Sequence, residues 1–484
     1  MLAILSNWAE GTGPLYARLA EAIGRAVDRG DLGAGARLPA ERNLAEALAL
    51  SRSTVVASYD RLAEDGMVER RQGSGTYVRR AALGPHDVTP AQLTQRLGSN
   101  TMFRGLISGP GETIDFSLAA PLAAPAVMEA LRRLPLTLPD TPSLGRGYMP
   151  AGYPPLREAV AAYLTDLGLP TNDRQVLITS GGQQALNLLA ALWLTPGDAA
   201  VVENPTYHGA LDAFRTARAR LLSLPVDEQG ARIELLHDLL GRTSARLVYV
   251  SPSFNNPTGV VLSQARRAEL ARLAADFQIP VVEDLVLTEV PLSAAPLPPP
   301  IAAVDGDGWV MTIGSMSKLF WGGLRVGWIR ASEQTIFRLA QLKAVADLGS
   351  SLVAQIASVE LLQRAAEVRA WRRAESQERL RSLASSLRTQ LPSWSWDMPA
   401  GGNELWVRLP QGSAADFLQV AARYGVTAAA GPLFSPDGSF ADHLRLTFVL
   451  EPHEMQEGVR RLAEAWQAYV PRAAQASREL APIV

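Results

Sequence analysis

The chain has 484 residues, with 46 lysines and arginines against 48 aspartates and glutamates, so its formal net charge is −2. This length exceeds what one hydrophobic core organises, so we expect two or more domains. The charge balance gives no overall field that would draw the protein onto nucleic acid. The sequence contains no cysteine, which excludes disulfides, thiolate metal sites and cysteine nucleophiles.

Residues 14–80 are predicted to form three short helices and a hairpin. The first helix follows from apolar residues at every fourth position, namely Leu15, Leu19, Ile23 and Val27. A second helix follows Pro39, and Ser51 is a suitable N-cap for a third. Two strand-like runs, 67–71 and 76–78, enclose a glycine-containing turn and indicate a hairpin. Together these elements predict a winged helix-turn-helix.

The predicted third helix carries the residues best suited to contact DNA. Arg52 and Ser53 lie in its first turn, away from its apolar face, and the first turn of a recognition helix is the part that enters the major groove. Arg52 can grip a guanine with two hydrogen bonds, while Ser53 and Thr54 can reach phosphates or base edges. Taken singly, Arg52 is equally well explained as a solvated helix residue, and the glycines of the hairpin as a tight turn.

Four segments in order, 37–45, 50–55, 59–62 and 73–78, resemble the GntR superfamily of winged helix-turn-helix regulators. The resemblance implies binding to a double-stranded DNA operator, with the wing backbone approaching the minor groove or phosphates. The DNA-binding residues that we expect are Arg42, Ser51, Arg52, Ser53, Thr54, Gly73, Ser74, Gly75 and Thr76. Residues 1–80 hold eleven arginines against ten acids, so we expect modest affinity per module and binding as a dimer.

The rest of the chain is predicted to form an α/β domain. Residues 81–111 are weakly periodic and are interpreted as a linker. Strand-like runs then alternate with helical segments, at 176–179, 199–203, 246–250, 279–284 and 309–313. This alternation predicts a mostly parallel sheet with helices on both faces, and residues 414–469 are predicted to form a smaller α+β subdomain. No apolar run could span a bilayer, and the N-terminus shows no secretory pattern, so we expect a cytoplasmic protein without membrane contact.

Lysine use singles out one position. The chain has only two lysines, Lys318 and Lys343, among many arginines. A lysine amine can act as a nucleophile, whereas a guanidinium cannot. Lys318 ends the segment Gly314–Lys318 after a predicted strand. This segment also satisfies the Ser-x-x-Lys motif of penicillin-binding enzymes, but the Ser-Asp-Asn and Lys-Thr-Gly tripeptides of that class are absent from the sequence.

The region from about 115 to 470 resembles the fold-type I pyridoxal-phosphate enzymes of the aspartate aminotransferase superfamily. Together with the N-terminal unit, it is similar to the MocR-type subgroup of GntR regulators. The resemblance implies a winged helix-turn-helix at 1–80, a linker at 81–111 and an aminotransferase-like effector domain at 112–484. It also implies a head-to-tail homodimer in which each DNA-binding domain lies near the partner's large domain. Pyridoxal 5′-phosphate is the expected cofactor, with Lys318 forming its Schiff base, and the scattered histidines give no reason to expect a metal.

The same resemblance assigns roles around Lys318. Ser315, Ser317 and Arg325 match phosphate contacts, and residues Ser180, Gly181, Gly182 and Gln183 precede a helix whose N-terminus can cradle an anion. The remaining matches are Asp284 for the pyridine nitrogen, Asn256 for the ring hydroxyl, Tyr207 for ring stacking, Tyr148 for the partner subunit's phosphate and Arg445 for an effector carboxylate. One departure stands out: the tyrosine usual shortly after the aspartate is replaced by Val286 and Leu287, which leaves Asn256 as the expected side-chain partner of the ring hydroxyl.

Three functions fit these observations. The first is a transcription regulator whose aminotransferase-like domain senses pyridoxal phosphate or a small amino compound. The second is an active aminotransferase that carries a DNA-binding arm. The third is a dimerisation module with a vestigial site. The DNA-binding unit favours the first, and the missing tyrosine makes efficient transamination less expected.

Overall fold

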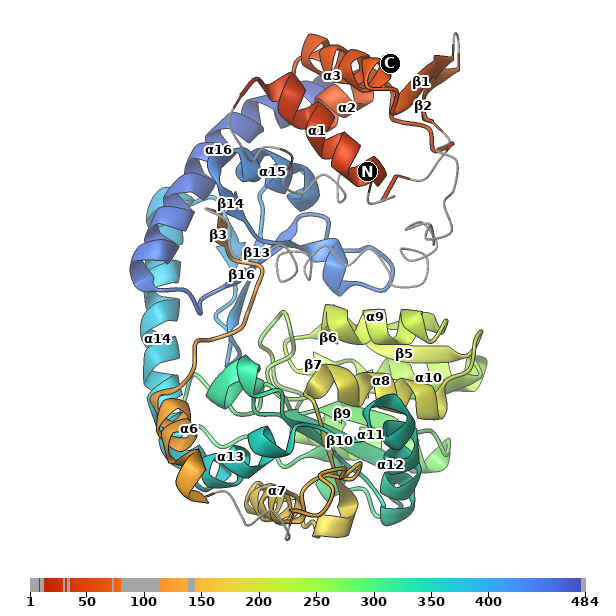
Figure 1. The fold of residues 1–484 in the computed structure, drawn as a ribbon, viewed down its shortest axis with the longest axis vertical. Helices are drawn as coiled ribbons and strands as arrows, with labels where there is room; N and C mark the ends of the chain where they lie inside the picture. Colours follow the sequence, from red (N-terminus) through yellow and green to blue (C-terminus); the bar gives the residue numbers. More distant parts are fainter. Residues whose placement is uncertain are drawn as a thin grey trace.

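The computed structural model describes residue 8 and residues 13–28, 31–32, 35–71, 74–79, 113–137 and 144–479. They form an N-terminal winged-helix unit, a large α/β domain and a smaller C-terminal subdomain (Figure 1). The predicted linker at 81–111 lies outside the described residues, and so does Gly73 of the predicted wing.

The winged-helix unit confirms the predicted helices and hairpin. Its elements are α1 (Leu15–Asp28), α2 (Glu41–Ala47), α3 (Arg52–Glu64), β1 (Val68–Arg71) and β2 (Gly75–Val78). Leu19 of α1 and Tyr59 of α3 are fully buried in one apolar core, as their spacing predicts. The Ser51 hydroxyl caps α3 by accepting a hydrogen bond from the backbone N–H of Thr54 at 3.1 Å.

An eight-stranded sheet in the order β4-β11-β10-β9-β8-β5-β6-β7 forms the centre of the large domain. Its strands are β4 (Val176–Thr179), β5 (Ala199–Asn204), β6 (Arg220–Asp227), β7 (Gly230–Ala231), β8 (Ala245–Val250), β9 (Val281–Asp284), β10 (Val310–Ser315) and β11 (Gly327–Arg330). The pairs that join β6, β5, β8, β9 and β10 are parallel, whereas β11 and β7 run antiparallel to their neighbours. All five predicted runs are strands, and the mostly parallel sheet is confirmed.

Helices cover both faces of this sheet. In β4, Ile178 packs into the core on one face, while its neighbour Leu177 packs into the core on the other. Because both faces are buried, the strands are continuously apolar rather than alternating. The helices of the domain are α6 (Pro125–Thr137), α7 (Pro154–Asp166), α8 (Gly182–Trp193), α9 (His208–Thr216), α10 (Ile233–Arg242), α11 (Gln264–Asp276), α12 (Glu333–Asp347) and α13 (Leu352–Gln363).

The C-terminal subdomain is α+β, as predicted, but it begins before Ala414. Its antiparallel sheet has the order β12-β13-β16-β15, and β3 from the start of the large domain pairs with β14 beside it. Phe116, just after β3, is fully buried in the subdomain core. The elements are β3 (Ile114–Asp115), α14 (Ala365–Gln390), β12 (Ser395–Trp396), β13 (Glu404–Arg408), α15 (Ala414–Ala421), β14 (Val426–Thr427), β15 (Ala429–Ala430), β16 (His443–Thr447) and α16 (Pro452–Glu479).

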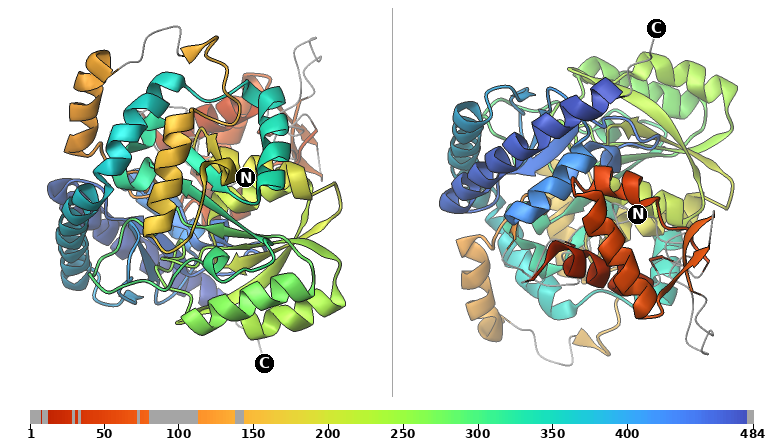
Figure 2. Two further views of the ribbon diagram at one scale, coloured as in Figure 1. Left: turned by 90° about the horizontal axis from the view of Figure 1, so that it is seen from below. Right: turned by 90° about the horizontal axis from the view of Figure 1, so that it is seen from above.

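The winged-helix unit lies beside α15 of its own chain (Figures 1 and 2). Arg423, which follows α15, donates a hydrogen bond from Nη1 to the carbonyl of Ala49 at 3.3 Å. Ala49 itself packs against the apolar core of the subdomain. Since Ala49 lies in the turn between α2 and α3, the segment just before α3 contacts the C-terminal subdomain directly.

Buried polar contacts fix the turn that follows β10. Arg372 of α14 is buried, and its guanidinium donates hydrogen bonds to the carbonyls of Leu122, Leu319 and Phe320 at 2.9–3.3 Å. Glu375 pairs with the same guanidinium at 2.7 Å. This arginine therefore holds in place the turn that contains Lys318. None of the helices in the described part of the chain combines the length and hydropathy that a bilayer-spanning segment needs.

Candidate functional site

Lys318 stands at the carboxyl edge of the parallel strands. It belongs to η5 (Ser317–Trp321), a single π-helical turn directly after β10. Its Nζ donates a hydrogen bond to the carbonyl of Ala119 at 2.6 Å. Burial lowers the pKa of Lys318 below its ordinary value, and the Glu404 carboxylate partly offsets this effect. An amine with a lowered pKa is more often unprotonated at neutral pH, so it is a better nucleophile.

Asp284 ends β9 and presents a buried carboxylate to the same site. Its Oδ2 accepts a hydrogen bond from the Tyr249 hydroxyl at 2.7 Å, and its Oδ1 accepts one from the N–H of Val286 at 2.9 Å. Burial raises the pKa of Asp284, while these hydrogen bonds and the charge of Lys318 act in the opposite direction. Tyr249, on the neighbouring strand β8, was not predicted from sequence, because an apolar strand run gives no sign that a tyrosine orients this acid.

The phosphate-binding residues expected from the sequence lie together. Gly181 and Gly182 form the start of α8, and the guanidinium of Arg325 lies against Gly181, where an added Cβ would be 3.1 Å from its Nη2. Gly181 also has a φ of 118°, which disfavours other residues. The hydroxyls of Ser315 and Ser317 are 3.1 Å apart. The helix N-terminus, the arginine and the two hydroxyls suit an anion such as phosphate.

The second lysine, Lys343, supports the segment before α8 through Gln184. Gln184 accepts hydrogen bonds at Oε1 from the N–H of Ser180 at 2.8 Å and from Nζ of Lys343 at 3.0 Å. Lys343 is buried and pairs with Asp347 at 2.7 Å. The sequence drew attention to Lys343 only as the other lysine, yet its spacing of four residues from Asp347 is a recognisable helical ion pair.

Two expected ring contacts have different surroundings. Tyr207 precedes α9 and donates a hydrogen bond to Oε1 of Gln183 at 3.3 Å, which places it beside the first turn of α8. Asn256 is instead engaged with the C-terminal subdomain: its Nδ2 donates to Glu404 at 3.2 Å, and its Oδ1 accepts from Arg445 at 3.3 Å. The amide nitrogen and the amide oxygen of Asn256 thus both have protein partners. Glu404 and Arg445 would therefore compete with a ring hydroxyl for the Asn256 amide.

The residues that replace the usual tyrosine do not supply a hydroxyl. Leu287 is buried with Phe254 and Val290 in a small apolar cluster. Val286 faces the start of α8, since a Cβ added to Gly182 would be 3.2 Å from Cγ2 of Val286. The departure seen in the sequence therefore makes this side of the site apolar.

Arg445, on β16, is fully buried at the same site. Its Nη2 donates to the carbonyl of Ser117, and Nη1 donates to Asn256. The guanidinium lies 4.8 Å from the centre of the Phe434 ring, and Nη1 is 4.0 Å from Oε1 of Glu404. Among the described residues, Nε of Arg445 has no hydrogen-bond partner. Glu404 was missed from the sequence, because an acid at the first position of β13 (Glu404–Arg408) gives no local sign that its side chain is buried beside Arg445.

A separate buried acid on β5 gives the protein a testable pH dependence. Glu203 accepts hydrogen bonds at Oε2 from the N–H of Ser251 and from Asn255, at 2.8 and 2.9 Å. Burial raises its pKa from 4.5 to about 7. Between these values the folded protein binds a proton that the unfolded chain has released, so Glu203 makes the free energy of unfolding fall as pH rises.

Replacing Glu203 with glutamine should remove this dependence, because glutamine does not titrate and can keep its oxygen where Oε2 accepts both hydrogen bonds. From about pH 5 to about pH 8, the unfolding free energy of Glu203→Gln relative to wild type should rise by about 2–3 kcal/mol. Urea unfolding at several pH values measures this difference. A constant difference across the range would mean that the buried carboxyl has an ordinary pKa.

The first turn of α3, where the sequence predicts DNA contacts, is exposed. Ser51, Arg52 and Ser53 all face solvent, and the hydroxyls of Ser51 and Ser53 are 2.9 Å apart. Thr54 is half-buried, and its hydroxyl contacts that of Ser51. Arg42 of α2 is exposed as well. The structure thus brings the expected helix contacts onto one accessible end of the unit.

The wing is placed less uniformly. Ser74 and Gly75 are exposed at the hairpin turn, and the guanidinium of Arg37 lies close to Gly75. Thr76 is buried, with only 6% of its surface accessible, so its side chain packs inside the unit rather than facing DNA. This burial follows from the alternation of the β2 strand, which points Thr76 and Val78 to the same inner face.

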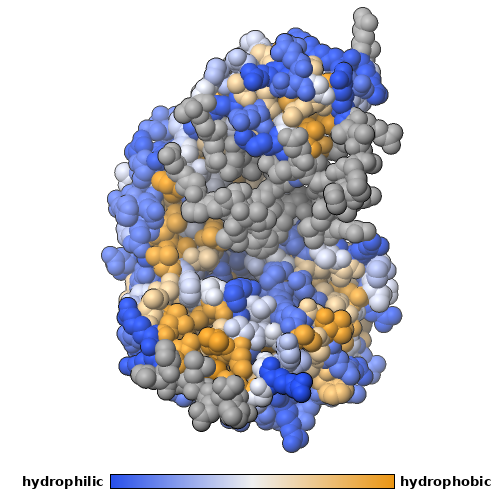
Figure 3. Space-filling model, in the orientation of Figure 1, coloured by the Kyte–Doolittle hydropathy of each residue, from blue (hydrophilic) through white to orange (hydrophobic). Residues whose placement is uncertain are grey.

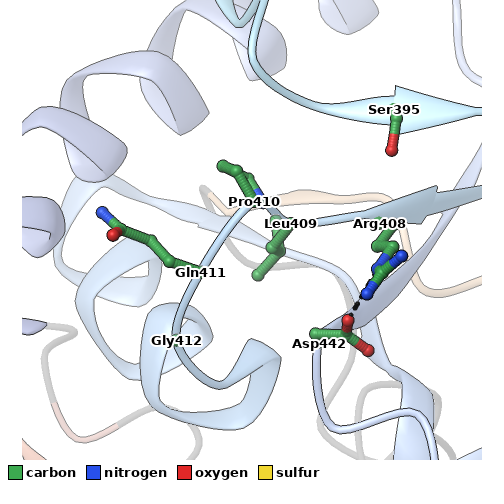
Figure 4. A pocket seen from close by; sticks show the side chains of 7 residues that line it. All are labelled: Ser395, Arg408, Leu409, Pro410, Gln411, Gly412 and Asp442. Carbon is green, nitrogen blue, oxygen red and sulfur yellow. Dashed lines mark hydrogen bonds and ion pairs between the residues drawn. The ribbon is translucent and has the colours of Figure 1, made fainter.

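Two further observations bound the site. Among the described residues, no group of three or more histidines, aspartates or glutamates could hold a metal ion. A separate pocket of about 460 Å³ lies at the end of β13 and contains none of the residues predicted to bind the cofactor, effector or DNA (Figure 4). It is lined by Ser395, Arg408, Leu409, Pro410, Gln411, Gly412 and Asp442. Arg408 and Asp442 form an ion pair across it at 2.8 Å, so the charges of these two residues are already paired.

Comparison with known families decides what this combination is. Residues 114–462 match the family of class I and II aminotransferases, and residues 15–78 match the gntR family of bacterial regulatory proteins. The chain belongs to the class I and II aminotransferase family. Its N-terminal unit is a GntR-type DNA-binding domain, and the fusion of the two is the architecture of the MocR-type transcription regulators.

Relatives of both kinds support this assignment. The chain is 30% identical to the HTH-type transcriptional regulator YdfD of Bacillus subtilis, over 93% of this chain and 95% of YdfD. It is 27% identical to the probable rhizopine catabolism regulatory protein MocR of Rhizobium meliloti, over 94% of each chain. The structure is similar to LysN, the α-aminoadipate aminotransferase of Thermus thermophilus, in complex with N-(5′-phosphopyridoxyl)-L-leucine. The TM-score is 0.71 and the identity 30%, covering 78% of this chain and 96% of LysN.

The cofactor of this fold family is pyridoxal 5′-phosphate, and the residues present fit it. The phosphate has an open cradle at Gly181, where a side chain would crowd Arg325. The buried carboxylate of Asp284 would suit the ring nitrogen, and the amine of Lys318 would suit the aldehyde. This GntR–aminotransferase chain therefore retains the groups that the cofactor requires, apart from the tyrosine replaced by Val286 and Leu287.

Proposed function

We propose that this regulator holds pyridoxal 5′-phosphate at Lys318 and changes its hold on an operator when the aminotransferase-like domain senses an amino compound or the cofactor itself. One observation carries the proposal: the exposed first turn of α3 at Ser51–Ser53 and the amine of Lys318, which lies beside the acids Asp284 and Glu404, stand on the same chain. An aminotransferase alone has no evident use for an exposed DNA-binding turn. Since DNA binding takes place where the chromosome lies, the proposed location is the bacterial cytoplasm.

Each residue has a defined part in holding the cofactor and its ligand. When bound, pyridoxal phosphate supplies an aldehyde that condenses with primary amines. Asp284, oriented by Tyr249, keeps a proton on the ring nitrogen. Arg325 and the start of α8 bind the phosphate. Tyr207 covers the ring, and Arg445 binds the ligand's carboxylate, with Nε as its available donor.

The C-terminal subdomain supplies the path to DNA. Arg445 stands on β16 of this subdomain, and Arg423 of the same subdomain contacts Ala49 just before α3. A ligand that binds Arg445 and the large domain together favours one placement of the subdomain over others. It shifts the equilibrium only by the difference in its affinity for the two placements. The contact at Ala49 would pass that change to the recognition helix.

A homodimer completes the proposal. Exposed apolar side chains gather on the large domain near α6 and α13, on the face seen in Figure 3. Exposed apolar residues in or next to these elements in the sequence include Leu122 and Met128 for α6, and Leu348 and Val353 for α13. Tyr148 is 69% exposed, which suits a residue that reaches a partner's phosphate rather than its own. Exposed apolar patches of this kind mark association sites. Sedimentation analysis should give the mass of a dimer. Within this dimer, we expect a head-to-tail arrangement in which each DNA-binding domain lies near the partner's large domain.

The deciding experiment measures operator affinity and turnover on one preparation. An operator selected from random duplexes should bind with an affinity that changes at least about tenfold when pyridoxal phosphate, or an amine added to the loaded protein, is present. Turnover with an amino donor and a keto acid should stay far below that of an aminotransferase. Rapid turnover without any effect on DNA affinity would favour the active enzyme. Absence of both cofactor absorption and turnover would favour a purely structural domain.

A further inference from the structure

Besides Asp284, the site contains a second carboxylate, that of Glu404, for which the cofactor has no use. It stands on β13 with 3% of its surface accessible. Its Oε1 accepts a hydrogen bond from Asn256 at 3.2 Å and lies 4.0 Å from Nη1 of Arg445, and its Oε2 accepts from the N–H of Asn403 at 2.8 Å. A charge that is buried at a binding site needs a partner, and these contacts supply only part of one.

The charges around Lys318 indicate what that partner is. The charged groups that act on Lys318 are the cation Arg445 and the two acids Glu404 and Asp284. Asp284 is hydrogen-bonded by Tyr249 and suits the ring nitrogen, so of these two acids Glu404 is left for the ligand, 4.0 Å from Nη1 of Arg445. Asp115 also acts on Arg445 electrostatically. A ligand that brought only a carboxylate to Arg445 would place it beside a second buried negative charge, and this repulsion is strong at such a distance inside a protein.

Arg445 and Glu404 together match a group that carries both charges. The guanidinium offers Nε, which has no partner among the described residues, and the carboxylate stands next to it. An α-amino acid carries an ammonium beside a carboxylate, so its carboxylate can pair with Arg445 while its ammonium pairs with Glu404. If that head occupies Arg445 and Glu404, a second amino group is needed at the Lys318 end of the site.

We propose that the effector is a diamino carboxylic acid: its carboxylate pairs with Arg445, one ammonium pairs with Glu404, and its other amino group lies at Lys318. This inference rests on the proposed function and names the ligand class for the same site. A monoamino acid leaves Glu404 against a carboxylate, and a diamine leaves Arg445 unmatched. The competing explanation is that Glu404 only anchors Asn256 and the turn at Asn403, and it predicts no ligand preference.

Matched ligands separate the two explanations. Calorimetry on protein loaded with pyridoxal phosphate compares L-ornithine with 5-aminopentanoate, which lacks the second amine, and with 1,4-diaminobutane, which lacks the carboxylate. The same trio is tested one methylene shorter and one longer. L-Ornithine or one of its two homologues should bind at least about tenfold more tightly than both of its counterparts. Equal affinities within all three trios, or a preference for the monoamino acids, would overturn the inference.

A matched pair of variants tests the residue itself. Glu404→Gln should weaken the diamino acid about tenfold and strengthen the monoamino acid, so that the preference disappears. Glu203→Gln removes an equally buried acid that faces Ser251 and Asn255, and it should keep the wild-type ranking. An unchanged ranking in a Glu404→Gln protein that still loads the cofactor contradicts the inference. If Glu404→Gln fails to fold, the wild-type ranking still decides. A wild-type protein that never takes up the cofactor contradicts the proposed function instead, because cofactor absorption is recorded separately.

Discussion

Replacing Lys318 with alanine is expected to abolish the visible absorption band that pyridoxal 5′-phosphate gives with this protein. The band requires a covalent link between the aldehyde and an amine, and Lys318 is the one amine on the turn after β10 that faces Asp284 and Arg445. Alanine is compatible with the helical turn and removes the amine together with the methylene chain that carries it. Phosphate binding through Arg325 and the start of α8 should persist in weakened form. Ligand-induced changes in operator affinity should disappear with the band, whereas basal operator binding should remain.

The matched control is Lys343→Arg, which changes the only other lysine and can keep the ion pair with Asp347. This variant should retain the band. Borohydride reduction of the loaded wild-type protein, followed by peptide mass spectrometry, should find the cofactor on Lys318. Cofactor found on Lys343, or a band that survives in Lys318→Ala, would show that the amine has been assigned to the wrong residue. Absence of a band in every protein would mean that the apolar replacement at Val286 and Leu287 has removed cofactor binding.

The site residues that could be predicted from sequence lie where a short motif carries both the chemistry and its position. Asp284 and Ser315 are the last residues of β9 and β10, and Lys318 lies in the turn after β10, so the strand pattern places all three at one edge of the sheet. The recognition turn at Ser51–Ser53 follows in the same way from a local capping signal. In these cases the sequence neighbours determine the geometry.

The remaining site depends on contacts between distant segments. Glu404 reaches Arg445 because β13 pairs with β16, and Asn256 reaches both only across the two domains. Nothing near Asn256 in the sequence indicates that its amide is shared with an acid far along the chain. Likewise, Thr76 lies in a motif that suggests DNA contact, but the pairing of β1 with β2 turns it inward. Tertiary packing decides these placements.

Replacing Arg52 with alanine is expected to remove most of the specific affinity for the operator while leaving the fold intact. Arg52 is exposed in the first turn of α3, and Ser51, not Arg52, caps the helix, so the loss should come from base contacts. A bidentate arginine–guanine contact contributes about 1–3 kcal/mol. One such contact per half-site corresponds to roughly a tenfold to hundredfold loss for each half-site of a dimer. Affinity for unrelated DNA should change far less, because it depends on phosphate contacts.

Arg61→Ala is the matched control for this prediction. Arg61 lies on the last turn of the same helix, is more than half exposed and sits 3.9 Å from Asp65, an ion pair too loose and exposed to matter much for stability. Fluorescence anisotropy at one fixed salt concentration, with the selected operator and with a scrambled duplex, should show a loss of specificity for Arg52→Ala only. Equal losses in the two variants would indicate a general electrostatic effect. Unchanged affinity of Arg52→Ala would contradict the assignment of α3 as the recognition helix, and the wing around Ser74 and Gly75 would then be the region to test.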